Sequence, residues 1–193
     1  MFSIFVLIWF SYAALILALI IGFDKVKNAS LHRQLPRTSF SIIIAFRNEE
    51  NHLPALLQSL KALNYDARLF EIILVNDAST DSSVALCIAF QKKHKHLNIS
   101  VIERQNLLLS PKKDAIDTGV KHAVNQWILC TDADCLLPQN WLQCYDQFIQ
   151  KTEARFIAGP VVFTKKSGFL YHFQTLNFLS LAGSTIGSFG LGK

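Results

Sequence analysis

A continuous apolar pattern opens the chain. From Phe2 to Phe23 no side chain is charged, and Phe, Ile, Leu, Val and Ala predominate. This length matches the roughly 20 apolar residues that cross the hydrocarbon core of a bilayer as a helix. Residues 1–23 are therefore predicted to form a transmembrane anchor.

A cleaved signal peptide is the alternative interpretation of this segment. Such a peptide normally has a basic start, a shorter apolar core and a cleavage site of small residues, and nothing basic precedes the apolar run here. Basic residues follow the run at Lys25, Lys27, Arg33 and Arg37. Because Lys and Arg near the end of a membrane helix favour the cytoplasmic side, we expect the remainder of the chain to be cytoplasmic.

From residue 40 onward, short apolar runs alternate with amphipathic segments. Residues 24–39 are polar and basic without hydrophobic periodicity, which predicts a juxtamembrane linker before a domain over residues 40–193. Runs rich in β-branched residues predict buried strands, and leucines at three- and four-residue spacing predict helices. The expected strands cover 40–46, 70–75, 99–103 and 127–130, and the expected helices cover 53–63, 84–90 and 114–125. This alternation predicts an α/β fold with a mostly parallel sheet flanked by helices.

Polar residues follow several of these strands at their carboxyl ends, where parallel sheets bind ligands. Asp132 and Asp134 form a D-x-D directly after the strand 127–130. Hard divalent cations such as Mg²⁺ or Mn²⁺ bind oxygen ligands of this kind. A D-x-D alone is more often part of a surface loop than of a metal site, but its position directly after a buried strand favours a metal site.

Three other strand-end or loop positions are candidates for ligand contact. Asp77 could accept a hydrogen bond from a nucleobase or a ribose, while the nearby Ser79, Thr80 and Asp81 suit turns and helix caps. Glu49 is either a ligand contact or an acid favoured in the first turn of a helix. Lys112 and Lys113 could meet a diphosphate, although loop lysines are usually solvated. The candidate residues at the strand ends and in the basic loop all fall at one edge of the predicted sheet. Together they predict a pocket for a phosphorylated, metal-bound ligand.

Composition narrows the class of protein further. Of the 193 residues, 51% are hydrophobic and 17% are charged. Ordinary soluble domains have about 25% charged residues. The lower charged fraction agrees with a segment of the chain lying in lipid. The net charge of +5 is dispersed and accompanied by no nucleic-acid-binding motif, so no nucleic acid partner is expected. The four cysteines form no C-x-x-C pair and are interpreted as reduced thiols.

Four segments in order resemble the motifs of the family 2 glycosyltransferases. Residues 41–50 are similar to the family's opening strand and P-x-[YR]-N-E turn, with alanine in place of the proline, and residues 75–81 resemble its D-D-x-S-x-D. Residues 111–119 resemble G-K-x-x-A-L-N-x-G, and residues 131–134 resemble its metal-binding D-A-D. The resemblance covers residues 40–163.

The resemblance implies a GT-A fold and a set of roles. The residues that match positions contacting the donor nucleotide are Ala45, Arg47, Glu49, Asp77, Lys112 and Asp132, and those that match the metal ligands are Asp132 and Asp134. The implied donor is a nucleotide-diphospho-sugar, with a UDP-sugar favoured, and the implied acceptor is a lipid or a polysaccharide. The implied reaction is metal-dependent and inverting.

Two family features are not found up to Lys193. These are the acidic catalytic base and a later Q-x-x-R-W motif, so no catalytic residue is identified and the base is expected beyond Lys193. The apolar stretch Phe169–Leu181 is interpreted as the start of the acceptor side. We therefore expect this sequence to be a fragment that ends within the domain.

Two other functions remain open at this point. A nucleotidyltransferase would also combine a nucleotide fold with metal-binding carboxylates, but it is expected to carry a glycine-rich phosphate loop after the first strand, and residues 45–49 contain no glycine. A membrane-tethered binding or scaffold module without catalysis would retain the donor site and lack the base.

Overall fold

The computed structural model describes residues 2–26, 35–105, 110–164 and 167–192. Lys27 and Arg33, used above to predict the cytoplasmic side, lie outside these residues. The chain divides into two compact units, one made of residues 29–153 and the other of residues 1–28 with 154–193. Each unit is described by itself.

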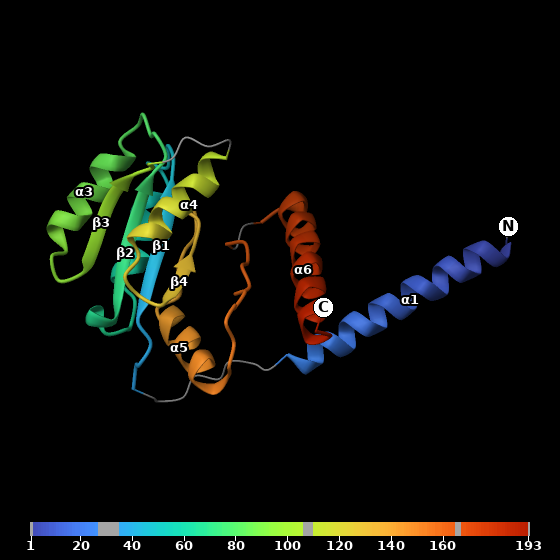
Figure 1. Cartoon of the computed structure of the whole chain (residues 1–193). Coiled ribbons are helices and arrows are strands. Elements are labelled where there is room, and N and C mark those ends of the chain that lie inside the picture. The colour runs from blue at the N-terminus through green and yellow to red at the C-terminus, as the bar shows by residue number, and fades with distance from the viewer. Residues whose placement is uncertain (1, 27–34, 106–109, 165–166, 193) are drawn as a thin grey trace. The chain divides into compact units, whose positions relative to one another are not determined.

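The unit 29–153 is built from alternating strands and helices (Figure 1). Its elements are β1 (Phe40–Phe46), α2 (Leu53–Lys61), a 3-10 turn (Ala67–Leu69), β2 (Phe70–Asn76), α3 (Ser83–Lys93), β3 (Asn98–Glu103), α4 (Pro111–His122), β4 (Trp127–Cys130) and α5 (Trp141–Lys151). The four strands are parallel and lie in the order β3-β2-β1-β4. The expected α/β fold with a parallel sheet is confirmed.

The two central strands carry the most apolar runs of the sequence. In the pairing of β1 with β2, Phe40 lies opposite Phe70 and Phe46 opposite Asn76. In the pairing of β1 with β4, Phe40 lies opposite Trp127 and Ile43 opposite Cys130. Nearly every residue of β1 and every residue of β2 is buried, whereas the edge strands β3 and β4 are partly exposed. A central strand has another strand on each side and a layer of helices on each face, so its side chains do not reach water. This is why continuous runs of β-branched residues form the two central strands.

Side-chain alternation along the strands divides the core between two faces of the sheet. On one face, Phe40, Ile42 and Ile44 pack with residues of α2, α3 and α5. On the other face, Ile43 packs with Ala115 of α4. Here a Cβ on Gly119 would lie 2.4 Å from Ile43 Cγ2, so only glycine lets α4 approach the sheet this closely.

The connections reverse direction at β1, and this reversal creates the site described below. The chain steps from β1 to β2 to β3 and then crosses to β4 on the far side of β1. With a constant crossover handedness, the returning helix α4 covers the opposite face from α2 and α3. The carboxyl ends of β1 and β4 therefore flank a topological switch point, where open α/β sheets form ligand crevices.

Element boundaries differ from the sequence prediction by a few residues. α4 begins at Pro111, three residues before the expected start, because proline suits the first turn of a helix. α3 begins at Ser83, and the Asp81 side chain accepts its first amide at 3.0 Å. The N-cap residue is Ser82, whose side chain makes no capping bond, so the first amide is satisfied by Asp81 from the position before the cap. Ser79 and Thr80 bond to another loop.

Residues 35–39, at the end of the segment predicted to be a linker, form no helix or strand and are hydrogen-bonded to Asp146 of α5. The buried Asp146 carboxylate accepts the Thr38 amide at 3.0 Å, and the Tyr65 hydroxyl donates to the Thr38 carbonyl at 2.7 Å. Burial and the charge of Asp146 raise the pKa of Tyr65. The chain thus enters β1 in one defined direction.

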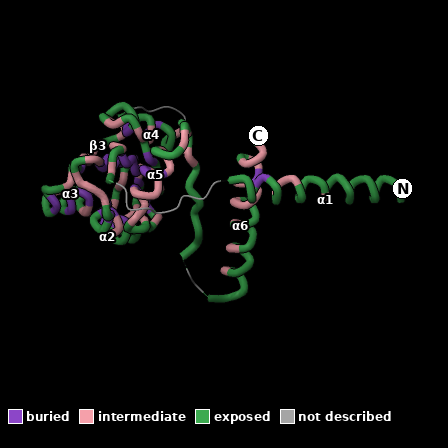
Figure 2. The backbone as a smooth tube through the Cα atoms, turned by 90° about the horizontal axis from the view of Figure 1, so that it is seen from below, coloured by how far each residue is buried: buried purple, intermediate pink, exposed green. Residues whose placement is uncertain are grey.

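The unit of residues 1–28 and 154–193 contains two helices, α1 (Phe2–Lys25) and α6 (Phe169–Gly190). α1 is almost wholly exposed (Figure 2), with a mean hydropathy of 2.8 over its most apolar window. Within the described residues, only α1 is long and apolar enough to cross a membrane. The helices meet at Gly22 and Gly187, where a Cβ on Gly22 would lie 2.0 Å from the Gly187 carbonyl oxygen.

Candidate functional site

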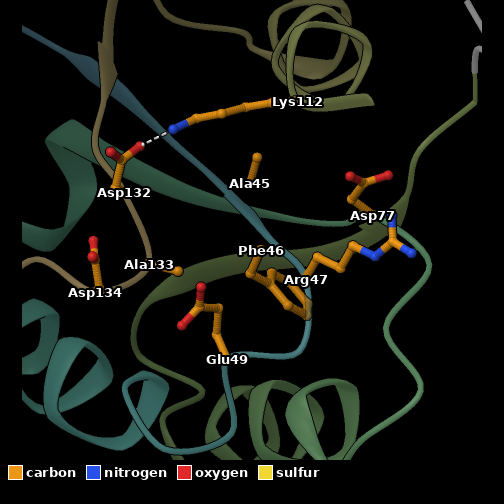
Figure 3. Close-up of a pocket in the computed structure, with 9 residues that line it drawn as sticks. All are labelled: Ala45, Phe46, Arg47, Glu49, Asp77, Lys112, Asp132, Ala133 and Asp134. Atoms are coloured by element: carbon orange, nitrogen blue, oxygen red, sulfur yellow. Dashed lines mark hydrogen bonds and ion pairs between the residues drawn. The ribbon is translucent and has the colours of Figure 1, made fainter. Parts of the chain in front are cut away.

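A cavity of about 240 Å³ opens at the carboxyl edge of the sheet (Figure 3). Its lining residues are Ala45, Phe46, Arg47, Glu49, Asp77, Lys112, Asp132, Ala133 and Asp134. They come from the end of β1, the loops after β1, β2 and β4, and the first turn of α4. The structure therefore brings together every residue to which the family resemblance assigned a nucleotide or metal contact.

The loop after β4 presents the two carboxylates of the D-x-D. Ala133 is 4% exposed and packs in the core, whereas the Asp132 side chain is 58% exposed. Figure 3 shows Asp132 and Asp134 on one side of the cavity, and Arg47 and Asp77 on the other. The small buried residue thus anchors the loop and leaves its acidic neighbours at the cavity wall.

Lys112 forms an ion pair within the cavity. Its Nζ lies 2.8 Å from Asp132 Oδ1, and its side chain is 65% exposed. The hydrogen bond to Asp132 raises the pKa of Lys112, so the amine carries its charge at neutral pH. Lys113, considered with it from the sequence, does not line the cavity. One lysine of the pair is therefore available to a ligand in this cavity.

The donor set at this wall suits a hard divalent cation. Among the described residues, no three His, Cys, Asp or Glu side chains group closely enough to enclose an ion. Two carboxylates without further protein ligands match the way Mg²⁺ is commonly bound, with phosphate oxygens and water completing the shell. Lys112 would have to leave Asp132, which costs little because exposed ion pairs contribute about 0–1 kcal/mol.

Asp77 is held by an arginine that the sequence reasoning missed. Arg104 follows β3 directly, and its Nε lies 2.7 Å from Asp77 Oδ1, while its Nη1 lies 3.5 Å from Asp114 Oδ2. The two carboxylates are 7% and 5% exposed. Within the described structure neither of these oxygens has a well-aligned hydrogen-bond donor, so the contacts are ion pairs. Its position was the available signal, because Arg104 directly follows the strand β3 and so lies at the same carboxyl edge as the other strand-end residues.

The remaining polar residues of these loops have different surroundings. Glu49 Oε2 lies 2.7 Å from Nδ1 of His52, at the start of α2, and Arg47 is exposed. Asn76, which stands where the family often has its first aspartate, donates to Glu103 at 2.7 Å and accepts the Ser79 amide at 3.0 Å. Asn76 therefore shapes the turn and does not line the cavity.

The cysteines carry no reactive arrangement. Cys87, Cys130, Cys135 and Cys144 are all free, in agreement with the expectation of reduced thiols. Burial, followed by the charge of Asp132, raises the pKa of Cys130, and burial raises that of Cys87 to about 12. Raised thiol pKa values disfavour the nucleophilic thiolate.

The chain matches a known family, described as glycosyl transferase family 2, over residues 41–190. Among curated proteins it is similar to the poly-β-1,6-N-acetyl-D-glucosamine synthase of Staphylococcus epidermidis strain RP62A, with 26% identity over 83% of this chain and 38% of the relative. The synthase of Staphylococcus aureus strain MSSA476 is 25% identical over 74% of this chain and 33% of the relative. The chain thus spans well under half the length of these proteins.

Two solved structures share its fold. The mannosyltransferase PcManGT from Pyrobaculum calidifontis, in complex with GDP-Man and Mn²⁺, superposes with a TM-score of 0.60 at 21% identity, covering 72% of this chain and 40% of that one. Residues 1–349 of Staphylococcus aureus TarS, in complex with UDP-GlcNAc, give a TM-score of 0.52 at 24% identity, covering 66% and 38%. The expected GT-A fold is confirmed. With the match over residues 41–190, the chain belongs to glycosyl transferase family 2.

Proposed function

We propose that this chain is the donor-binding part of a membrane-anchored glycosyltransferase. The full protein would transfer a sugar from a nucleotide-diphospho-sugar to an acceptor hydroxyl, with inversion and with dependence on a divalent metal. The observation that carries the proposal is the single cavity that contains Arg47, Glu49, Asp77, Lys112 and the D-x-D. The cavity lies at the switch point between β1 and β4, where this class of sheet binds nucleotides.

The donor would lie across the cavity from Asp77 to Asp132. Arg47, Glu49 and Asp77 would contact the nucleoside, with Ala45 beneath it, and Lys112 and Asp132 would lie at the diphosphate end. A UDP-sugar is favoured because TarS is solved with UDP-GlcNAc, although PcManGT is solved with GDP-Man. The polysaccharide synthases among the relatives favour a polysaccharide or lipid-linked acceptor.

Asp132 and Asp134 would hold the metal, Mg²⁺ or Mn²⁺. When bound, the ion offsets the charge that grows on the departing nucleoside diphosphate. Lys112 would exchange Asp132 for a phosphate oxygen and add a second positive charge there. The protein would thus contribute two carboxylates that position the cation and a positively charged lysine that contacts the phosphate directly.

No residue of this chain is proposed as the catalytic base. We expect the acid that deprotonates the acceptor hydroxyl in the part of the protein that would correspond to the uncovered length of the relatives. α1 would anchor the protein, with the 29–153 unit on the cytoplasmic side, because the residues that follow α1 are basic.

Isothermal titration calorimetry of the detergent-solubilised chain tests this proposal. UDP and GDP are titrated with Mn²⁺, with Mg²⁺ and with EDTA. We expect UDP to bind only with a metal, and Asp134→Ala to weaken that binding by at least about tenfold, as expected when an ion-mediated contact is lost. Asp117→Ala, which removes an equal charge outside the cavity, should bind as the wild type does. Unchanged binding by Asp134→Ala would refute the metal role.

A further inference from the structure

The loops after β1 and β2 carry the nucleoside side of the cavity, and they are bonded to each other. Residues 47–52 supply Arg47 and Glu49, and residues 77–82 supply Asp77. Three consecutive amides of the first loop donate to side chains of the second loop and of α3. The bonds are Asn48 N to Ser79 Oγ at 3.1 Å, Glu49 N to Ser83 Oγ at 2.8 Å, and Glu50 N to Asp81 Oδ2 at 3.1 Å.

Bonds also run in the opposite direction. The Thr80 amide donates to Asn48 Oδ1 at 2.8 Å, and the Ser82 amide donates to Glu50 Oε2 at 3.1 Å. Backbone amides of each loop are thus satisfied by side chains of the other. A displacement of either loop would break bonds of both kinds.

Two residues of these loops adopt left-handed backbone conformations. Asn48 has φ 53° and Ala78 has φ 54°. Asparagine tolerates this region, whereas alanine seldom adopts it because its Cβ lies too close to the following carbonyl oxygen. Strained residues of this kind persist where the surrounding structure over-determines the backbone, and they concentrate at ligand sites. The reciprocal bonds supply that constraint on the C-terminal side of Ala78. On its N-terminal side, the Asp77 amide donates to the Phe46 carbonyl at 2.9 Å.

The same bonds limit what these loops can do for a ligand. Amides at helix N-termini commonly bind phosphate, but those of Asn48, Glu49, Glu50, Thr80 and Ser82 already have acceptors. They are therefore unsuited to hold the diphosphate, which is left to Lys112 and a metal. The loops serve the site through the placement of side chains.

We propose that Asn48 and Ser83 are positioning residues, which hold Arg47 and Glu49 at a fixed separation from Asp77. Neither lines the cavity, and Ser83 is fully buried. Asn48 provides the acceptor for Thr80 and tolerates the left-handed turn, and Ser83 provides the acceptor for the Glu49 amide. The identity of the ligand in this inference rests on the proposed function. The link between the two loops rests on the hydrogen bonds alone.

The test uses Asn48→Gly, which keeps the backbone conformation unstrained and removes only the side-chain acceptor. Amide hydrogen exchange should accelerate in the other loop, at Thr80 and Ser82, and UDP affinity with Mn²⁺ should fall about three- to tenfold, as for one lost hydrogen bond. Ser83→Ala should lower UDP affinity to a similar extent, but it should accelerate exchange at the Glu49 amide, whose acceptor it removes. Asn125→Ala, which removes bonds at the opposite edge of the sheet, should change neither quantity.

A double-mutant cycle separates positioning from general loss of stability. If Asn48 acts through Asp77, the affinity loss caused by Asn48→Gly should shrink in an Asp77→Ala background, whereas a destabilised fold would give additive losses. Unchanged exchange in residues 77–83, unchanged UDP affinity or full additivity would each overturn the positioning role. A wild-type chain that binds neither UDP nor GDP would instead overturn the proposed function, and the link between the loops would then stand or fall on hydrogen exchange.

Discussion

The amino edge of the sheet and the part of its carboxyl edge that carries Lys112 and Asp132 treat polar groups in opposite ways. At the amino edge, the buried Glu71 carboxylate accepts the Ser41 hydroxyl at 2.5 Å and the Val124 amide at 2.9 Å, and Ser41 accepts the Asn125 amide at 3.1 Å. At the carboxyl edge, the side chains of Lys112 and Asp132 are more than half exposed, and they form an ion pair with each other.

This difference separates structure from binding. A buried polar network whose members are all satisfied stabilises one arrangement, and it has nothing left to offer a ligand. Exposed charges in a cavity contribute little to stability because water screens them, and they can exchange partners. The amino edge thus fixes how β1, β2 and β4 start, whereas Lys112 and Asp132 at the carboxyl edge remain able to exchange partners. Four substitutions test this contrast, from the largest expected effect to the smallest.

Glu71→Ala should destabilise the protein most. It leaves the Val124 amide and the Ser41 hydroxyl buried without an acceptor, which costs about 3 kcal/mol of unfolding free energy. Urea unfolding followed by tryptophan fluorescence measures the loss. Glu71→Gln, which keeps an acceptor oxygen, should lose less. UDP affinity of the folded fraction should be unchanged, and a fall in that affinity would contradict the separation of the two edges.

Gly119→Ala should also act on stability. The added Cβ would lie 2.4 Å from Ile43 Cγ2, and relieving such an overpacked contact costs about 2 kcal/mol. Thermal unfolding by circular dichroism checks this. Gly183→Ala is the control, because a Cβ there meets no atom within 4 Å among the described residues. Equal melting temperatures for the two variants would show that α4 is not constrained at Gly119.

Lys112→Gln should leave stability unchanged and weaken binding. The Lys112–Asp132 pair is exposed, so its loss costs less than about 1 kcal/mol of unfolding free energy. UDP affinity with Mn²⁺ should fall about fivefold, since one phosphate-binding charge is lost. Calorimetry compares it with Lys113→Gln, the neighbouring lysine outside the cavity, which should bind normally. Equal losses in both variants would indicate a general effect of charge.

Ala78→Gly should give the smallest change. Glycine adopts φ 54° without steric cost, and the gain is partly offset by the flexibility of glycine in the unfolded chain, so we expect a net gain of about 0.5 kcal/mol. Ala89→Gly, the same substitution inside α3, should instead lose about 1 kcal/mol. Urea unfolding measures both. A destabilised Ala78→Gly would argue against strain at this turn.

Much of this architecture was predictable because it depends on local patterns. The run at residues 40–46 predicted β1 without error, since a strand buried on both faces needs uninterrupted apolar residues. The D-x-D at a strand end and Lys112 in the loop before a helix were assigned to one pocket from their positions in the α/β alternation, and they line one cavity.

Other features could not be predicted, because they depend on contacts between distant segments. Arg104 reaches Asp77 and Asp114 only once β3 lies beside β2. The strand order and the position of β4 next to β1 are set by packing of α4 on the second face, which no single segment encodes. The start of α4 was misplaced by three residues, because a proline can begin a helix as well as precede one.

By itself, the sequence determined the α/β alternation, the apolar first helix and the chemistry at the strand ends, because periodicity and residue type are local properties of the chain. Only the tertiary structure decided which strand ends face one another, how Arg104 holds Asp77, and how the loops after β1 and β2 brace each other. Those arrangements depend on hydrogen bonds and ion pairs between residues up to dozens of positions apart, which form only when the sheet has assembled.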